Sequence, residues 1–160
     1  MIFTFPNTDQ PFTFSPTLDG LVCSVEVRWL AFGRRWYIAV SDPTGNLLVN
    51  RALVGSRSPV ALTNLTWELG VASADAAEPL GLPVGSVARA LVYGCSPGAY
   101  NGWYTVRVTG AASFAFDIAQ DPGSVVTLGS WAPAVDLVRG YFQTSSLVYW
   151  SGRAQFEALP

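Results

Sequence analysis

The amino-acid sequence contains no histidine and no lysine, so all nine of its basic residues are arginines. Histidine is the side chain whose ordinary pKa lies nearest to neutral pH, and it is the commonest general base and metal ligand. Arginine stays protonated in proteins and therefore cannot accept a proton as a base. Because the two residue types that carry most proton chemistry are missing, we expect a protein that is not an enzyme and that holds no cofactor or metal.

Charge of either sign is scarce. Charged residues make up 12% of the chain, whereas about 25% is usual in soluble domains. Half of the 160 residues are hydrophobic, so there is ample material for a core. A soluble monomer covers its surface with polar groups, and we expect a chain this poor in charge to bury part of its outside against partners. The alternative is a compact β-protein whose surface is rich in serine, threonine and glycine.

The sequence lacks the signals for nucleic-acid binding, for a membrane span and for secretion. The net charge is −2 and the only basic doublet is Arg34-Arg35, whereas binding to nucleic acid needs many cationic contacts with phosphates. No stretch reaches the roughly 18 apolar residues of a membrane span. Residues 1–6 lack the basic start and apolar run of a signal peptide. We therefore expect no nucleic acid, no membrane span, and a protein made in a cytoplasm.

The two cysteines, Cys23 and Cys95, stand far apart in the chain. Cys23 alternates with Val25 and Val27, a pattern typical of a buried thiol on a strand. Cys95 lies in a Gly-Cys-Ser-Pro-Gly segment that predicts a turn. One distant pair without histidine does not make a zinc site, whereas a disulfide between the two cysteines stays open.

A β-meander is predicted in the first third of the chain. Residues 23–29 alternate between apolar and polar side chains, as in a half-buried strand. Residues 36–40 are apolar on both faces, which indicates a central strand. A hairpin turn is expected at 31–34, and the Asp-Pro-Thr-Gly segment at 42–45 has the chemistry of a second turn. Residues 46–52 then return as a third strand.

A second β-hairpin is predicted further along. Apolar and polar side chains alternate over residues 104–109 and again over 114–118, with a loop at 110–113 between them. The Asn-Gly pair at 101–102 is a tight-turn dipeptide. Residues 124–128 are expected to add one more strand.

Helical signals are weak. The best helical candidate is the alanine-rich segment 73–78, which is too short to stand alone and ends at Pro79. We read residues 70–83 as a loop or junction with at most one helical turn. No long helix is expected, so the predicted fold class is all-β.

The C-terminal part supplies strand-like segments at residues 135–142, 146–150 and 154–159. These segments need partners, and the N-terminal meander is the expected one. We therefore predict two domains. Residues 1–65 and 133–160 form a small barrel or sandwich, and residues 66–132 form an inserted β-hairpin module.

Two stretches of the chain resemble known proteins. The first combines residues 3–14, 18–20, 35–37, 140–142 and 145–150 with Phe156. Together they resemble small, plug-like β-proteins of the baseplate and tail hub of contractile-tailed bacteriophages. That family has an N-terminal strand, a meander with an aromatic central strand, and a closing strand near a Phe-Glu-x-x-Pro tail. Here the tail reads Phe156-Glu-Ala-Leu-Pro160.

The second stretch consists of residues 94–106, 113–116 and 121–123. It resembles a Tyr-Asn-Gly-x-Tyr-Thr-Val hairpin module that recurs in phage tail proteins, although Trp103 stands where a small residue is more usual. Neither resemblance brings a catalytic motif. Both imply a virion structural protein of the tail baseplate or hub, assembled in the host cytoplasm with other tail proteins. A closed homo-oligomer, a trimer or a hexamer, is expected around the tail axis.

Four residues are candidates for contacts with partners. Arg34 and Arg35 lie at the predicted hairpin tip, where guanidinium groups suit carboxylates across an interface, although a solvated turn is the plain alternative. Trp103 is expected on the strand face opposite Tyr104, on the same side as Arg107. An exposed tryptophan there would anchor a neighbouring subunit, and packing against the rest of the chain is the alternative.

Two other functional classes stay open. A carbohydrate-binding β-sandwich would use exposed aromatic side chains as a stacking platform, although we expect Trp36 in the core. An enzyme would need two carboxylates that face each other across a pocket. The acidic residues are scattered, and no spacing singles out a pair among Glu26, Glu68, Asp117 and Asp136.

Overall fold

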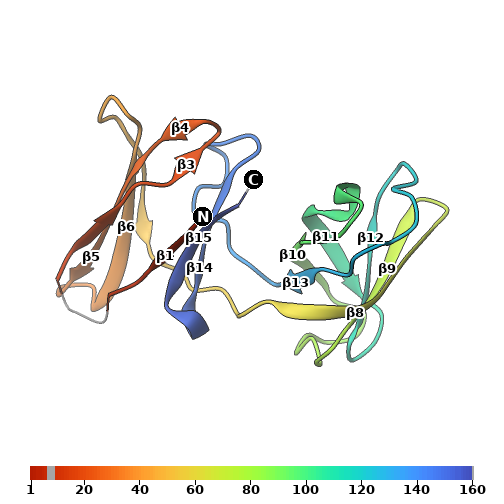
Figure 1. The fold of residues 1–160 in the computed structure, drawn as a ribbon. Helices are drawn as coiled ribbons and strands as arrows, with labels where there is room; N and C mark the ends of the chain where they lie inside the picture. Colours follow the sequence, from red (N-terminus) through yellow and green to blue (C-terminus); the bar gives the residue numbers. More distant parts are fainter. Residues whose placement is uncertain (7–9, 160) are drawn as a thin grey trace. The chain divides into compact units, whose positions relative to one another are not determined.

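The computed structural model describes residues 1–6 and 10–159 (Figure 1). Over these residues the chain forms fifteen β-strands and two 3-10 helices of three residues each. The predicted all-β class is therefore confirmed. Two small parts of the stretches that resemble phage proteins, residues 7–9 and Pro160, lie outside the described residues.

The chain divides into two compact units, which we call the sandwich unit and the barrel unit. The sandwich unit comprises residues 1–56 and 135–160, and the barrel unit comprises residues 57–134. The expected boundary at residues 65–66 falls inside strand β8 (Val60–Glu68). β8 belongs with the barrel because it pairs with β9 (Val71–Ala76) and, near its start, with β13 (Ser130–Ala132).

Two antiparallel sheets make up most of the sandwich unit (Figure 1). The four-stranded sheet has the order β2-β5-β6-β7, with bounds Phe12–Phe14, Ser24–Leu30, Arg35–Ser41 and Leu47–Ala52. The three-stranded sheet has the order β1-β15-β14, with bounds Ile2–Thr4, Gln155–Leu159 and Ser146–Trp150. A short ribbon pairs β3 (Thr17–Leu18) with β4 (Leu21–Val22). The predicted meander is confirmed as β5, β6 and β7, with β6 in the middle as expected.

The two sheets share one hydrophobic core. Val25 and Val27 on β5 and Ile38 on β6 are fully buried and belong to the same cluster as Phe156 on β15. The ring of Phe156 lies 4.9 Å from the ring of Phe14, measured between centroids. Alternate side chains of β5 therefore point inward, which is the pattern that its sequence predicted.

The C-terminal strands pair differently from expectation. β15 pairs with β14 on one side and with β1 on the other, and β14 and β15 contribute to the core under the meander without extending its sheet. Residues 135–142 do not form the predicted strand. The backbone N–H of Leu137 donates to the carbonyl of Leu147, and the carboxylate of Asp136 accepts a hydrogen bond from the N–H of Val138. Leu137 and Val138 are buried, so this apolar run reflects burial without strand pairing.

Six antiparallel strands close into the barrel, in the order β10-β11-β12-β9-β8-β13. β10 covers Val87–Tyr93, β11 covers Gly102–Val108 and β12 covers Ser113–Asp117. The predicted hairpin is present as β11 and β12. The inserted region is nevertheless a complete closed barrel, which is more than the hairpin module that the sequence suggested.

Strand β9 (Val71–Ala76) occupies the first part of the segment expected as a loop with at most one helical turn at residues 70–83, whereas residues 77–83 form a loop as expected. Ala72, Ala74 and Ala76 are buried, while Ser73 between them is exposed. Alanine favours helix by intrinsic propensity, but the burial here alternates with a period of two. β8 and β12 pair with β9 on its two sides. Alanine suits this position because the interior of a small barrel accepts small side chains beside large ones.

The strand expected at residues 124–128 is also not formed. Within this segment Thr127 pairs with Ser96 in an isolated bridge, and no longer ladder extends from it in the described chain. The segment before it is held by other bonds, because the hydroxyl of Tyr100 donates to the carbonyl of Gly123 at 3.0 Å. The result is an ordered loop along the barrel.

Candidate functional site

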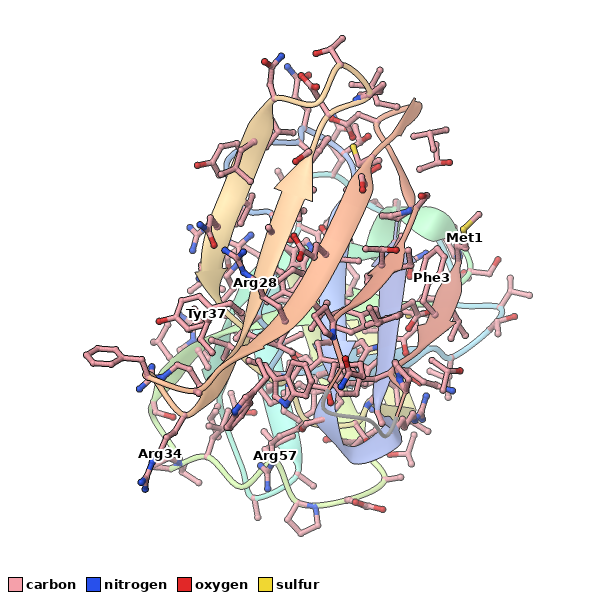
Figure 2. All side chains as sticks on the ribbon, turned by 90° about the vertical axis from the view of Figure 1, so that its left-hand side faces the viewer. Met1, Phe3, Arg28, Arg34, Tyr37 and Arg57 are labelled. Atoms are coloured by element: carbon pink, nitrogen blue, oxygen red, sulfur yellow. The ribbon has the colours of Figure 1, made fainter. Side chains whose placement is uncertain are left out.

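The turn between β5 and β6 carries two of the four predicted contact residues. Arg34 and Arg35 are both exposed there, and Figure 2 labels Arg34 at the end of the hairpin. The N–H of Arg34 donates to the carbonyl of Ala31 at 3.3 Å, and Arg34 has a left-handed backbone with φ of 47°. That conformation is uncommon for a residue with a side chain. The hairpin therefore exposes the guanidinium groups of two consecutive residues.

Large apolar side chains accompany these arginines. The relative exposure is 106% for Phe32, 42% for Trp29 and 36% for Leu30. Trp29 packs edge-on against Trp36, with ring centroids 5.6 Å apart. We call residues 29–36 the hairpin tip. A cluster of exposed large apolar side chains is typical of a protein-contact surface.

The other two predicted residues lie on β11, in the barrel unit. Trp103 is half-buried, and the guanidinium carbon of Arg89 lies 5.2 Å from its ring centroid in a cation–π arrangement. Arg107 is exposed and stands opposite Val87 on one neighbouring strand and Ala115 on the other. Trp103 thus packs within its own unit and does not protrude. Arg34 and Arg35 are neighbours at the hairpin, whereas Trp103 and Arg107 lie four residues apart on β11 and face different partners, Leu91 and Val87. The two pairs belong to different units.

A cavity of about 460 Å³ lies along β8 in the barrel unit, lined by Leu65, Thr66, Trp67, Tyr100, Asp121, Gly123, Ser124 and Val125. Several of its polar groups are already bonded within the chain. The indole Nε1 of Trp67 donates to the carbonyl of Ile118 at 2.9 Å, and a carboxylate oxygen of Asp121 accepts from the N–H of Gly123 at 2.8 Å. These groups stabilise the wall of the cavity, which leaves few of them to hold a ligand.

A second cavity, of about 330 Å³, lies on the outer face of the four-stranded sheet. We call it the polar groove, and it is lined by Thr13, Ser24, Glu26, Arg28, Ala39, Ser41, Leu47 and Asn50. The register of the sheet explains the hollow. Thr13, Glu26, Ala39 and Asn50 lie in one row across β2, β5, β6 and β7. Ala39 has the shortest side chain of this row, so its neighbours form walls around it.

The polar side chains of the groove make no hydrogen bond with any residue that the structure describes. Arg28 is half-buried, and its Nε is buried without a hydrogen-bond partner. Glu26 is also half-buried, while Asn50 and Thr13 are exposed. The groove therefore differs from the cavity along β8, because its polar side chains are not used in hydrogen bonds among the described residues.

Two acidic turns of the sandwich unit show the opposite arrangement. The carboxylate of Asp19 accepts hydrogen bonds from the backbone N–H groups of residues 143–145, and these bonds, the first above all, hold its pKa well below the usual range. Hydrogen bonds from Thr44 and Asn46 lower the pKa of Asp42 to about 2. In both turns the acceptors are used to fasten loops.

The sequence identified the tip arginines but missed Phe32 beside them and the polar groove. Phe32 lies inside the segment that was predicted as a turn, and an aromatic residue in a turn was the available signal. Glu26 and Arg28 were visible as the outward side of an alternating strand. Their neighbours across the sheet, Ala39 and Asn50, depend on strand register, which the alternation of one strand does not determine.

The described part of the chain shows no group of three or more His, Cys, Asp or Glu side chains that is placed to hold a metal ion. Cys23 and Cys95 are free thiols in different units, and burial raises the pKa of each. Among the described residues no helix is both long and apolar enough to cross a membrane. The polar groove contains one carboxylate, that of Glu26, so it does not hold the facing pair that a glycosidase needs.

Comparison of the chain with family models, curated proteins and solved structures finds no match. What its surfaces can do therefore has to be derived from their own geometry and chemistry.

Proposed function

We propose that the protein is a structural subunit of a larger assembly and that it joins this assembly through the hairpin tip. The exposed ring of Phe32 is the observation that carries the proposal. Burying a phenylalanine side chain contributes about 2 kcal/mol, and a partner that covers Phe32 gains this contribution. Trp29 and Leu30 extend the apolar surface around it, as in the centre of a protein interface.

The arginines beside Phe32 indicate what the partner surface offers. The planar guanidinium group forms paired hydrogen bonds with carboxylates, so Arg34 and Arg35 favour an apolar pocket with acidic residues at its edge. The chain itself carries eleven carboxylates against nine arginines. A second copy of the chain therefore supplies suitable charges, and a closed ring would give every hairpin tip the same partner surface.

The sequence resemblance supports a specific setting for this assembly. On that basis the protein is a component of the tail baseplate or hub of a contractile-tailed phage, and its neighbours are other tail proteins. The absence of histidine and lysine agrees with a role that involves no proton chemistry. The proposed oligomer is a trimer or a hexamer, built in the host cytoplasm and carried in the virion.

A carbohydrate-binding module that uses exposed aromatic side chains is less well supported. The rings of Trp29 and Trp36 are inclined at 66° to each other, and a flat stacking platform needs rings that are close to coplanar. Trp103 is half-buried with Arg89 over its ring. These aromatic side chains suit packing and protein contact better than stacking against a sugar.

Light scattering behind a sizing column tests the proposal. We expect the wild-type protein to form a trimer, a hexamer or an association that grows with concentration. We expect Phe32→Ser to shift the mass towards that of the monomer, and Val126→Ser to leave it unchanged. Val126 is a matched control because it is 81% exposed and lies in a barrel loop. A wild-type protein that stays monomeric, or association that survives Phe32→Ser, would contradict the assigned role of the tip.

A further inference from the structure

The polar groove collects hydrogen-bonding side chains from four neighbouring strands. Figure 2 shows this face of the sheet, with Arg28 and Tyr37 upon it. Residues on one face of a strand are separated by about 6.6 Å, and neighbouring strands by about 4.8 Å. Glu26 and Asn50 therefore stand roughly 10 Å apart across Ala39. The volume of about 330 Å³ lies within the range of small-ligand sites.

The groove offers both hydrogen-bond donors and hydrogen-bond acceptors to a ligand. Glu26 can only accept hydrogen bonds while it is ionised, Arg28 can only donate them, and Asn50 can do both. A ligand that satisfies all three has to donate and accept at closely spaced positions. Sugar hydroxyl groups have this property, because each of them is both a donor and an acceptor.

Charge and shape narrow the ligand class further. The groove holds one carboxylate and one guanidinium group, Glu26 and Arg28, so its lining carries no net charge and favours a neutral ligand. Tyr37 stands directly across from Arg28 on the same face and is half-buried. The ring of Tyr37 lies beside Gly33 at the hairpin tip and does not line the groove. Burial of the Arg28 Nε leaves the terminal nitrogens of the guanidinium as its donors to a ligand.

We propose that the polar groove on the outer face of the four-stranded sheet binds a short, neutral saccharide through Glu26, Arg28 and Asn50, with Ala39 as its floor. This inference goes beyond the assembly role, because the groove and the hairpin tip use different residues. Its ligand is held by hydrogen bonds from polar side chains, whereas the tip offers apolar rings.

An array of defined neutral and acidic oligosaccharides tests the proposal, followed by titration calorimetry with the best neutral ligand. We expect Ala39→Leu to fill the hollow and weaken binding at least about tenfold. We expect a similar loss for Glu26→Gln, which keeps the shape of the side chain but removes an acceptor and the charge. Thr105→Leu, a substitution on an exposed position of β11 in the barrel, is the matched control and should bind like the wild type.

Two further comparisons keep the test decisive. Phe32→Ser should bind the saccharide with wild-type affinity, so failure of the assembly role and failure of the groove can be told apart. Circular dichroism of each variant confirms that it is folded, and Glu26→Gln serves if Ala39→Leu does not fold. The proposal is overturned if the wild type binds no oligosaccharide at millimolar concentration, binds acidic ones alone, or binds equally well after both groove substitutions.

Discussion

The sandwich unit and the barrel unit differ in whether their sheets have free edges. The barrel pairs each of its six strands on both sides, so it has no free edge. The sandwich has two open sheets, which end at β2 and β7 and at β1 and β14. An open sheet leaves backbone groups and a flat outer face for partners, whereas closure removes them. The difference indicates that the sandwich unit offers more surface for contacts with partner proteins than the barrel unit does.

The two cores differ in a matching way. Aromatic rings fill the space between the sandwich sheets, and Phe14, Phe156 and Tyr149 are in ring contact. The barrel interior combines large side chains such as Phe114 with the alanines of β9. A closed barrel has a fixed width, so large residues must face small ones. The gap between two open sheets adjusts more freely to its contents.

Replacing one large aromatic side chain in each core should have the largest effect and should show whether the two units are stabilised separately. We expect Phe156→Ala to destabilise the sandwich unit and Phe114→Ala to destabilise the barrel unit, each by about 3–5 kcal/mol. The two residues belong to separate hydrophobic clusters, so each change should act on one unit. Urea unfolding followed by amide NMR signals of both units measures the effect. Equal loss of signals from both units in either variant would show that the units unfold as one.

A methyl group added at Gly129 should disturb the barrel alone. A Cβ atom at this position would lie 2.7 Å from the backbone nitrogen of Cys95 and would clash with the carbonyl oxygen of Tyr93. Overpacking of this kind costs about 1–3 kcal/mol, and we expect Gly129→Ala to lower the stability of the barrel by such an amount. Gly98→Ala is the matched control because its nearest neighbour would lie at 3.8 Å. Equal stability of the two variants would contradict the packing described.

Acid should lower the stability of the sandwich unit by protonating Asp19 and Asp42, whose carboxylates hold two loops through hydrogen bonds. The pKa values of Asp19 and Asp42 are lower in the folded state than the ordinary aspartate value of about 3.9. Their contribution to stability is therefore present above that value and is lost as the pH falls through the folded pKa, which is about 2 for Asp42. We expect the Tm of the sandwich to fall between pH 4 and pH 2.

The Asp19→Ala variant checks the origin of that acid response. At pH 6 it loses the hydrogen bonds to residues 143–145, and we expect a Tm lower by about 5 °C. Its further decrease on acidification should be smaller than that of the wild type, because one of the titrating groups is gone. Calorimetry at both pH values measures this. An unchanged acid response would assign the effect to other groups.

The smallest expected effect concerns the thiols. Cys23 and Cys95 are free and buried in different units, so dithiothreitol should leave the Tm unchanged. A thiol reagent should react with neither cysteine until the protein unfolds, because the thiolate is the reactive form and burial raises the pKa of both. Rapid labelling of the native protein would contradict this, as would a Tm that falls on reduction.

Prediction from the sequence was most successful where the signal for a strand or turn lies within that segment. The alternation of residues 23–29 and the turn at Asp42 were enough to place the meander, because both signals are local. β9 was missed because alanine is ambiguous between a helix and the interior of a barrel. The sequence predicts a strand at residues 135–142 from its apolar run, but such a run indicates burial only and does not specify a pairing partner.

The same reasoning separates the two candidate sites. Arg34 and Arg35 could be located from the predicted turn between two strands. The polar groove could not, because Glu26 and Asn50 meet across Ala39 through the register of three strands. Register depends on contacts between segments that are distant in sequence, and the pattern of a single strand does not contain it.

Hydrogen–deuterium exchange of the wild-type protein at low and high concentration tests the central claim most directly. If the sandwich unit carries the assembly surface, amides of residues 29–36 should become protected as the protein associates, while the barrel strands exchange at the same rate throughout. Protection that develops on β10 and β11, with the hairpin tip unchanged, would contradict the account and assign the interface to the barrel unit.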